Sequence, residues 1–243
     1  MKNLFKLCVV AVCLAVVGCN VTGKTSDDKA TCSSECTAKE QKKCKSMITF
    51  KNEDFYKANG EFDVEKGKAA IISLMKYHGY PVYPGIEKTL WVSDYGTGQF
   101  TKLGLAANMF KNNEDDHYML MDLFLLPGQM LPEHWHLDGE TNPAKREGWL
   151  IRWGKSYVVG VGEDNMAEYP EVKVPKIHMN GEVTTKHVVA ATPGVFVPLK
   201  EVYTRHWQFG GPEGAIITEV ANVHTDAAVR HSDKAVNAYF LGE

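Results

Sequence analysis

The chain has 243 residues, a formal net charge of −3 and 44% hydrophobic residues. Nucleic-acid binding needs clustered Lys and Arg to meet the phosphates, and the sequence has no basic stripe, which argues against this class of partner. Roughly 200 residues, from about Met47 to Glu243, are enough for one domain with a proper core.

The first residues have the pattern of an export signal. Lys2 and Lys6 precede an apolar run over residues 7–17, which is too short to span a bilayer as a helix. Cys19 directly follows the small residue Gly18, as in a bacterial lipobox. We therefore expect an exported lipoprotein, on the periplasmic or cell-surface side, whose contact with the membrane is the lipid on Cys19. The alternative is an ordinary secretory signal with an incidental cysteine.

The next stretch, over residues 20–46, predicts a flexible tether because it is polar and has almost nothing apolar to bury. All six cysteines lie in these two N-terminal segments: Cys8, Cys13, Cys19, Cys32, Cys36 and Cys44. Three tether thiols cannot all pair within one chain, so one is free or cross-linked between chains, unless they hold a metal. The expected organisation is a signal over 1–19, a tether over 20–46 and a disulfide-free domain over 47–243.

The domain is predicted to begin with a helix and continue as short strands. Residues 63–78 have helical apolar spacing, with Asp63 as N-cap and Gly79 as the stop. Strands rich in Val, Ile and aromatic residues are expected over 89–93, 118–126, 148–153, 156–161, 186–191, 195–199, 206–209 and 215–221. Gly154 marks a tight hairpin turn over residues 153–156. The pattern favours a mainly β fold, a sandwich or a jelly-roll barrel.

His134, His136, Glu147 and His206 are candidate metal ligands. The two histidines of the H-x-H motif point to the same face of a strand. Three imidazoles and a carboxylate suit a first-row divalent ion that keeps positions open for a substrate. On the tripeptide alone, two surface or barrel histidines remain the alternative.

An ordered set of sequence blocks resembles the cupin-type D-lyxose isomerases, which are jelly-roll sugar isomerases that use manganese. The blocks are residues 129–136, 143–147, 152–154, 206–207, 211–214 and 218–220, joined by 54–56, 79–81 and 100–104. The resemblance covers essentially the whole domain after the tether. It implies a cupin barrel with an N-terminal helical segment, Mn²⁺, a monosaccharide substrate and aldose–ketose isomerisation, and it leaves a homodimer open.

The resemblance places the metal ligands on His134, His136, Glu147 and His206. Glu140 competes with Glu147 because it stands at the spacing of generic cupins. Glu140 lies in a turn-rich stretch where a solvated side chain is expected, so Glu147 is the preferred ligand.

Isomerisation moves a proton between C1 and C2 of the sugar through an enediolate, which needs charge stabilisation and an acid–base group. Glu219 is the candidate base, because a carboxylate in the apolar stretch 216–220 is costly unless it serves a site or is paired. An outward-facing strand residue is the alternative. Lys145 matches a family lysine that could donate to the substrate oxygen, or it is a solvated loop residue.

Asp226 and Asp233 are predicted to bind sugar hydroxyls, with exposed surface acids as the alternative. The remaining histidines receive no role: His78, His117, His178, His187, His224 and His231. The sequence departs from the family pattern at Trp135, Arg146, Gly148 and Trp149, and in the loop 137–142. These changes are expected around the mouth of the pocket, so the accepted sugar can differ from lyxose. Two other functions compete: a non-catalytic surface cupin that binds a sugar or uronate, and an iron-dependent dioxygenase.

Overall fold

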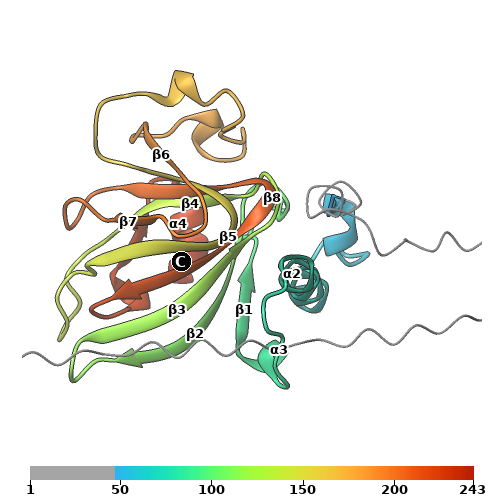
Figure 1. Cartoon of the computed structure of the whole chain (residues 1–243), viewed down its shortest axis with the longest axis horizontal. Helices are drawn as coiled ribbons and strands as arrows, with labels where there is room; N and C mark the ends of the chain where they lie inside the picture. The colour runs from blue at the N-terminus through green and yellow to red at the C-terminus, as the bar shows by residue number, and fades with distance from the viewer. Residues whose placement is uncertain (1–46) are drawn as a thin grey trace, which may run out of the picture. The chain divides into compact units, whose positions relative to one another are not determined.

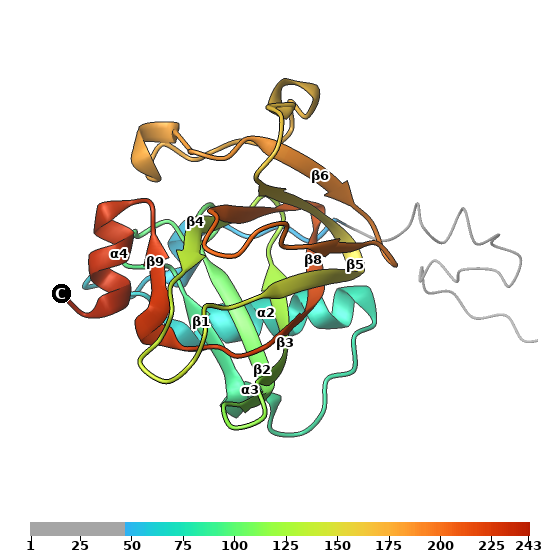
Figure 2. The same cartoon turned by 90° about the vertical axis from the view of Figure 1, so that its left-hand side faces the viewer.

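The computed structural model describes residues 47–243, and the predicted signal and tether lie outside them. One curled antiparallel sheet dominates this part of the chain (Figure 1, Figure 2). Its strands are β1 (Leu90–Ser93), β2 (Leu105–Asn113), β3 (Tyr118–Leu125), β4 (Met130–His136), β5 (Glu147–Gly160), β6 (His187–Ala191), β7 (Phe196–Pro198), β8 (His206–Ala221) and β9 (Val229–His231). The expected mainly β fold, with a helix before a curled sheet, is confirmed.

Helices are short and lie outside the sheet. They are η1 (Asn52–Phe55), α2 (Val64–His78), α3 (Ile86–Thr89), η2 (Met166–Glu168), η3 (Met179–Gly181), η4 (Asp226–Ala228) and α4 (Lys234–Leu241). Within the described residues, none is both long and apolar enough to cross a membrane.

Strand β8 is the centre of the sheet. Along one edge it pairs with β5, from Ala221 opposite Glu147 to Trp207 opposite Val159. Along its other edge β3 pairs with the second half of β8, and β4 pairs with the first, where His206 lies opposite His134. The H-x-H strand and the strand that begins with Glu147 therefore flank the same strand.

The hairpin turn predicted over residues 153–156 is wrong, because β5 runs straight through it. Gly154 has a φ of 71° at an irregularity in the pairing of β5 with β8. A Cβ at this position would lie 2.1 Å from the backbone oxygen of Gly214. The glycine therefore permits a close approach of two strands within a bulge and not a chain reversal. The two strands expected over 206–209 and 215–221 are likewise one strand, β8.

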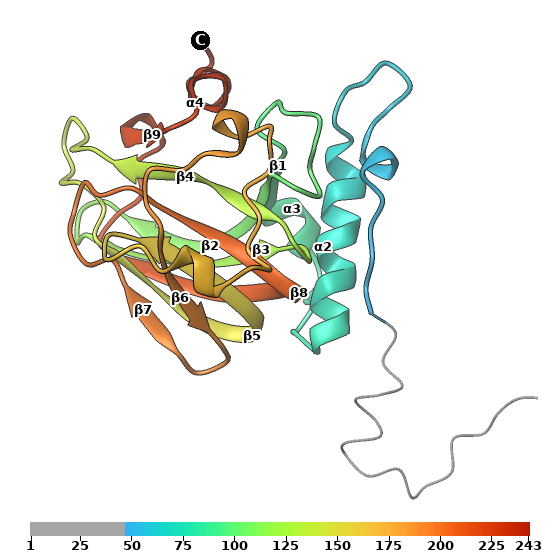
Figure 3. The same cartoon turned by 90° about the horizontal axis from the view of Figure 1, so that it is seen from above.

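Helix α2 is formed as predicted and covers the outer face of the sheet (Figure 3). The Asp63 carboxylate accepts a hydrogen bond from the Lys66 backbone N–H, and Gly79 ends the helix with a φ of 76°. The helix buries Ile71, Leu74 and Met75 in a cluster that includes Phe124 and Ile216. A second cluster fills the barrel interior, with Leu123, Trp149, Ile151, Tyr157 and Ile217 among its members.

Candidate metal centre and active site

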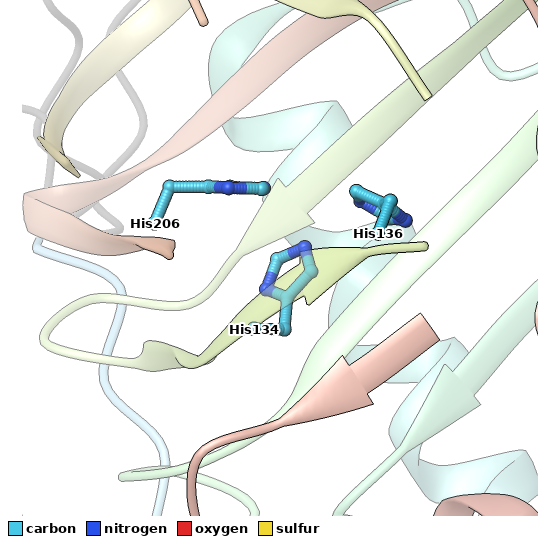
Figure 4. Close-up of side chains that lie close together, drawn as sticks. All are labelled: His134, His136 and His206. Atoms are coloured by element: carbon cyan, nitrogen blue, oxygen red, sulfur yellow. The ribbon is translucent and has the colours of Figure 1, made fainter. Parts of the chain in front are cut away.

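Three histidines meet on the inner side of the barrel (Figure 4). His134 and His136 come from β4, and His206 comes from the neighbouring β8. One ring nitrogen from each lies within 4.8 Å of those of the other two. The ring centroids of His134 and His206 are 4.3 Å apart. The period of two along a strand therefore brings the H-x-H pair to one face, as the sequence predicts.

Hydrogen bonds to the backbone orient two of these rings. Nδ1 of His134 lies 2.9 Å from the carbonyl oxygen of Pro132, and Nδ1 of His206 lies 3.0 Å from that of Thr204. An Nδ1–H that donates to a carbonyl leaves Nε2 unprotonated, as a metal ligand must be. Burial lowers the pKa of His136 to about 4 and lowers the pKa of His134 well below its ordinary value, so both rings are neutral at pH 7.

Glu147 completes the set of donor atoms. Its Oε1 lies 3.1 Å from Nε2 of His136 and 3.1 Å from Nε2 of His206. These three atoms are buried and have no hydrogen-bond partner. Burial tends to raise the pKa of Glu147, but Lys145 and the two histidines hold it well below its ordinary value, so the carboxylate is ionised. Converging buried acceptors without donors fit a divalent first-row ion, which satisfies all of them at once.

Glu140 and Glu147 differ in burial. Glu140 is exposed in the loop between β4 and β5, whereas the side chain of Glu147 is 1% exposed. The preference for Glu147 over Glu140 agrees with this geometry.

Lys145 joins the metal centre to the candidate base. Its ammonium group lies 3.1 Å from Oε2 of Glu147 and forms a short ion pair with Oε1 of Glu219. The other oxygen of Glu219 accepts a hydrogen bond of 3.1 Å from Nε1 of Trp149, which lies opposite Glu219 in the β5–β8 register. Glu219 therefore points inward, and Lys145 is buried and not solvated.

The charges in this cluster are set by burial and by one another. Burial raises the pKa of Glu219, against the lowering effect of Lys145. Burial lowers the pKa of Lys145, but Glu147 and Glu219 together outweigh it and raise the pKa above its ordinary value. A cationic lysine thus lies between one ionised carboxylate and one whose proton affinity is enhanced, which suits proton transfer.

No family model matches the chain. The D-lyxose/D-mannose isomerase of Thermosediminibacter oceani is 31% identical over 163 residues, covering 67% of this chain and 86% of that enzyme. The D-lyxose ketol-isomerase of Cohnella laeviribosi is 31% identical over 156 residues, covering 64% and 82%. This chain belongs to the D-lyxose isomerase family. The fold is also similar to the L-ribose isomerase of Acinetobacter sp. DL28, with a TM-score of 0.56 at 15% identity, covering 76% of this chain and 96% of that one.

In this member of the D-lyxose isomerase family, a cavity of about 470 Å³ opens beside the histidines. His134, His136, Lys145 and Glu219 contribute to its polar wall. Apolar side chains form much of the remainder, among them Leu105, Ala107, Met121, Leu123, Leu131 and Val229. Partial exclusion of water by such walls strengthens the electrostatic interactions inside.

The two aspartates predicted to bind substrate lie in different places. Asp226 lines the cavity and accepts a hydrogen bond of 2.8 Å from Nε2 of His224. Asp233 does not line it. Its carboxylate caps α4 through the backbone N–H of Ala235 and also accepts from that of Met179, so the structure gives Asp233 a capping role in place of the expected sugar contact.

Two of the departures from the family pattern lie elsewhere than expected. Trp135 faces away from the ligands and lies against Arg205, whose guanidinium carbon is 4.2 Å from the ring centroid. Arg146 is exposed, and its backbone N–H donates to the Asn222 side chain. Trp149, by contrast, is in the site itself through its bond to Glu219.

Sequence reasoning gave no role to His224, yet it lines the cavity beside Asp226. Burial lowers the pKa of His224, so its ring is neutral at pH 7. A single histidine in the sequence carries no pattern that predicts a position on a cavity wall. The Asp226 two residues later was the one available clue.

Proposed function

We propose that this protein is a metal-dependent aldose–ketose isomerase that converts D-lyxose, or an aldose of related configuration, into the corresponding ketose. The observation that carries the proposal is the position of Lys145, which contacts both the metal-ligand candidate Glu147 and the base candidate Glu219. One buried cluster thus unites a donor set for a divalent ion with an acid–base pair, at the wall of a cavity.

His134, His136, Glu147 and His206 would hold the ion, for which Mn²⁺ is our candidate. When bound, such an ion supplies Lewis-acid polarisation of the sugar oxygens and stabilises negative charge that develops on them. The open positions of the donor set leave room for a substrate to approach from the cavity.

The protein side chains manage the proton. The Glu219 carboxylate takes the proton from C2 of the aldose and returns it to C1, while the O2 hydroxyl proton ends on O1. Lys145 orients one oxygen of Glu219 and can donate to a substrate oxygen, and Trp149 fixes the other oxygen.

The test is a panel of aldoses, including D-lyxose, D-mannose, L-ribose and their epimers, incubated with protein loaded with Mn²⁺. Ketose formation is followed by chromatography, with chelator-treated protein and chelated protein reloaded with metal beside it. We expect turnover of at least one aldose, lost on chelation and restored on reloading. Protein that binds the ion and isomerises no aldose would contradict the proposal and favour a non-catalytic sugar-binding cupin.

We further propose that the protein is exported and anchored through lipid on Cys19. The support is the charged start, the apolar run over residues 7–17 and the Gly18–Cys19 pair. Labelling with a radioactive fatty acid in a bacterial host should mark the wild-type protein and not Cys19→Ser. Equal labelling of both proteins, or of neither, would contradict the anchor.

A further inference from the structure

We propose that His224 and Thr225 form a hydroxyl-binding subsite that holds the distal part of the sugar, away from C1 and C2. The inference deepens the proposed isomerase function and rests on it. It assigns a specificity role to two residues of the loop that follows β8.

Both residues contribute to the cavity wall, and each carries a buried polar atom without a hydrogen-bond partner. His224 and Thr225 line it. Nδ1 of His224 and Oγ1 of Thr225 are each buried without a hydrogen-bond partner. Buried polar atoms are nearly always hydrogen-bonded, so two adjacent exceptions at one cavity indicate that a ligand supplies the partners.

The hydrogen bond to Asp226 defines what His224 can offer. Its Nε2 lies 2.8 Å from Oδ1 of Asp226, and an ionised carboxylate only accepts, so Nε2 carries the proton. In the neutral ring Nδ1 is then an acceptor. The hydroxyl of Thr225 can both donate and accept. Together they match a sugar hydroxyl, which donates to one atom and accepts from another.

The loop is held in place for this role by β2. The Asn112 side chain donates to the backbone oxygen of His224 at 2.8 Å and accepts from its backbone N–H at 2.9 Å. These two hydrogen bonds hold the backbone of His224 against β2, as a preorganised site requires. Asn112 is therefore a positioning residue of the subsite.

The subsite lies within reach of a sugar bound at the metal centre. The ring centroid of His224 is 6.4 Å from that of His136. Lys145 and Glu219 line the same cavity. A sugar whose O1 and O2 are at the reacting end can thus place a later hydroxyl near His224.

The experiment compares His224→Leu, His224→Asn and Thr225→Val in the Mn²⁺-loaded enzyme, with Thr192→Val as a matched control in an exposed turn. KM and kcat are measured on the best aldose of the panel and on its 3-, 4- and 5-deoxy analogues. We expect His224→Leu and Thr225→Val to raise KM about 10-fold, as loss of one hydrogen bond does, with metal content and kcat nearly unchanged.

The analogues and the Asn variant separate recognition from a structural role. The analogue that lacks the hydroxyl bound by His224 should have a raised KM with the wild type. Its KM should be the same with His224→Leu, because the lost contact is the same one. His224→Asn keeps an acceptor near the position of Nδ1 and should recover most of the affinity. An unchanged KM in His224→Leu and Thr225→Val, or an equal loss on all analogues, would overturn the subsite while leaving the isomerase proposal intact.

Sugar binding measured by calorimetry on the Mn²⁺-loaded protein separates the two proposals. A wild type that binds aldose without turnover, with binding weakened in His224→Leu, would contradict the isomerase function and support the subsite. A wild type that binds no aldose would overturn both.

Discussion

Two buried glutamates on neighbouring parts of the barrel differ in how their charge is satisfied. Glu133, beside His134 on β4, is 0% exposed and accepts four hydrogen bonds from the backbone and hydroxyl groups of Thr184 and Thr185. Glu147, at the start of β5, has one oxygen paired with Lys145 and another that faces two imidazole nitrogens without any donor. The first carboxylate is saturated by its own chain, and the second is not.

The contrast shows that burial alone does not identify a functional carboxylate. A buried charge with complete hydrogen bonding ties structure together, here the loop around residue 184 to β4. A buried carboxylate oxygen that faces only hydrogen-bond acceptors is stabilised when a cation binds between them. Variants of Glu133 should therefore lower the stability of the fold, whereas variants of Glu147 and its neighbours should lose metal binding and sugar turnover.

The largest effect is expected from the histidines that face Glu147. Replacing His134, His136 or His206 by Ala removes a ligand and should abolish both metal retention and sugar turnover, while the barrel stays folded. Metal analysis after dialysis and circular dichroism measure the two properties separately. A His206→Ala protein that keeps its metal would remove this residue from the ligand set.

Glu219→Gln should lower kcat by about 10²–10⁴-fold, the range that positioned acid–base groups supply. The amide keeps the shape and can still accept from Lys145 or Trp149, so metal content and thermal stability should stay near those of the wild type. Turnover in heavy water gives the direct assay. Ketose that carries deuterium at C1 when made by the wild type, and that the variant forms more slowly by the same factor of about 10²–10⁴, would support Glu219 as the base.

Unchanged turnover in Glu219→Gln would remove Glu219 from this role. Wild-type turnover without any deuterium uptake would point to a hydride shift or to a shielded proton.

Glu133→Leu should act on stability and spare the metal. It leaves four donors of Thr184 and Thr185 without their acceptor, which should cost about 2–4 kcal/mol in the free energy of unfolding. For a domain of this size that is roughly a 5–15 °C fall in Tm. Thermal unfolding of metal-loaded protein measures it, and an unchanged Tm would show that the saturated carboxylate contributes little.

Glu140→Gln should have the smallest effect. The side chain is exposed in the β4–β5 loop, and exposed substitutions of this kind usually change stability by less than about 0.5 kcal/mol. Metal content and kcat/KM should match those of the wild type. Loss of metal in this variant alone would transfer the ligand role to Glu140.

Local sequence patterns predicted those parts of the fold that depend on neighbouring residues. The N-cap Asp63 and the stop Gly79 gave the bounds of α2, because capping is a local interaction. The H-x-H spacing predicted that two ligand candidates share one face of β4, because side chains alternate between the two faces along a strand. Asp233, followed by a short amphipathic stretch and Gly242, has the same capping pattern for α4, although the prediction for Asp233 was a contact with sugar hydroxyls.

Features that depend on contacts between distant strands could not be predicted. Strand β2 was not predicted, because Asn108, Lys111 and Asn112 break its apolar alternation. In the structure, the Asn112 side chain holds the backbone of a loop more than a hundred residues away along the chain. Gly154 looked like a turn because its positive φ serves either a hairpin or a bulge, and only the approach of Gly214 decides between them. His224 gained its place in the same way, through tertiary contacts.

The most direct measurement is the metal content of Glu147→Gln beside its matched control, Glu133→Gln. In the control, Oε1 still accepts three bonds from Thr184 and Thr185, and the new amide can donate to the Thr184 hydroxyl, so both stability and metal should be retained. Glu147→Gln replaces an ionised ligand by a neutral amide, so it should lose its metal on dialysis, and sugar turnover with it. Full retention of metal and activity in Glu147→Gln, or loss of metal in Glu133→Gln, would contradict the distinction between the two carboxylates.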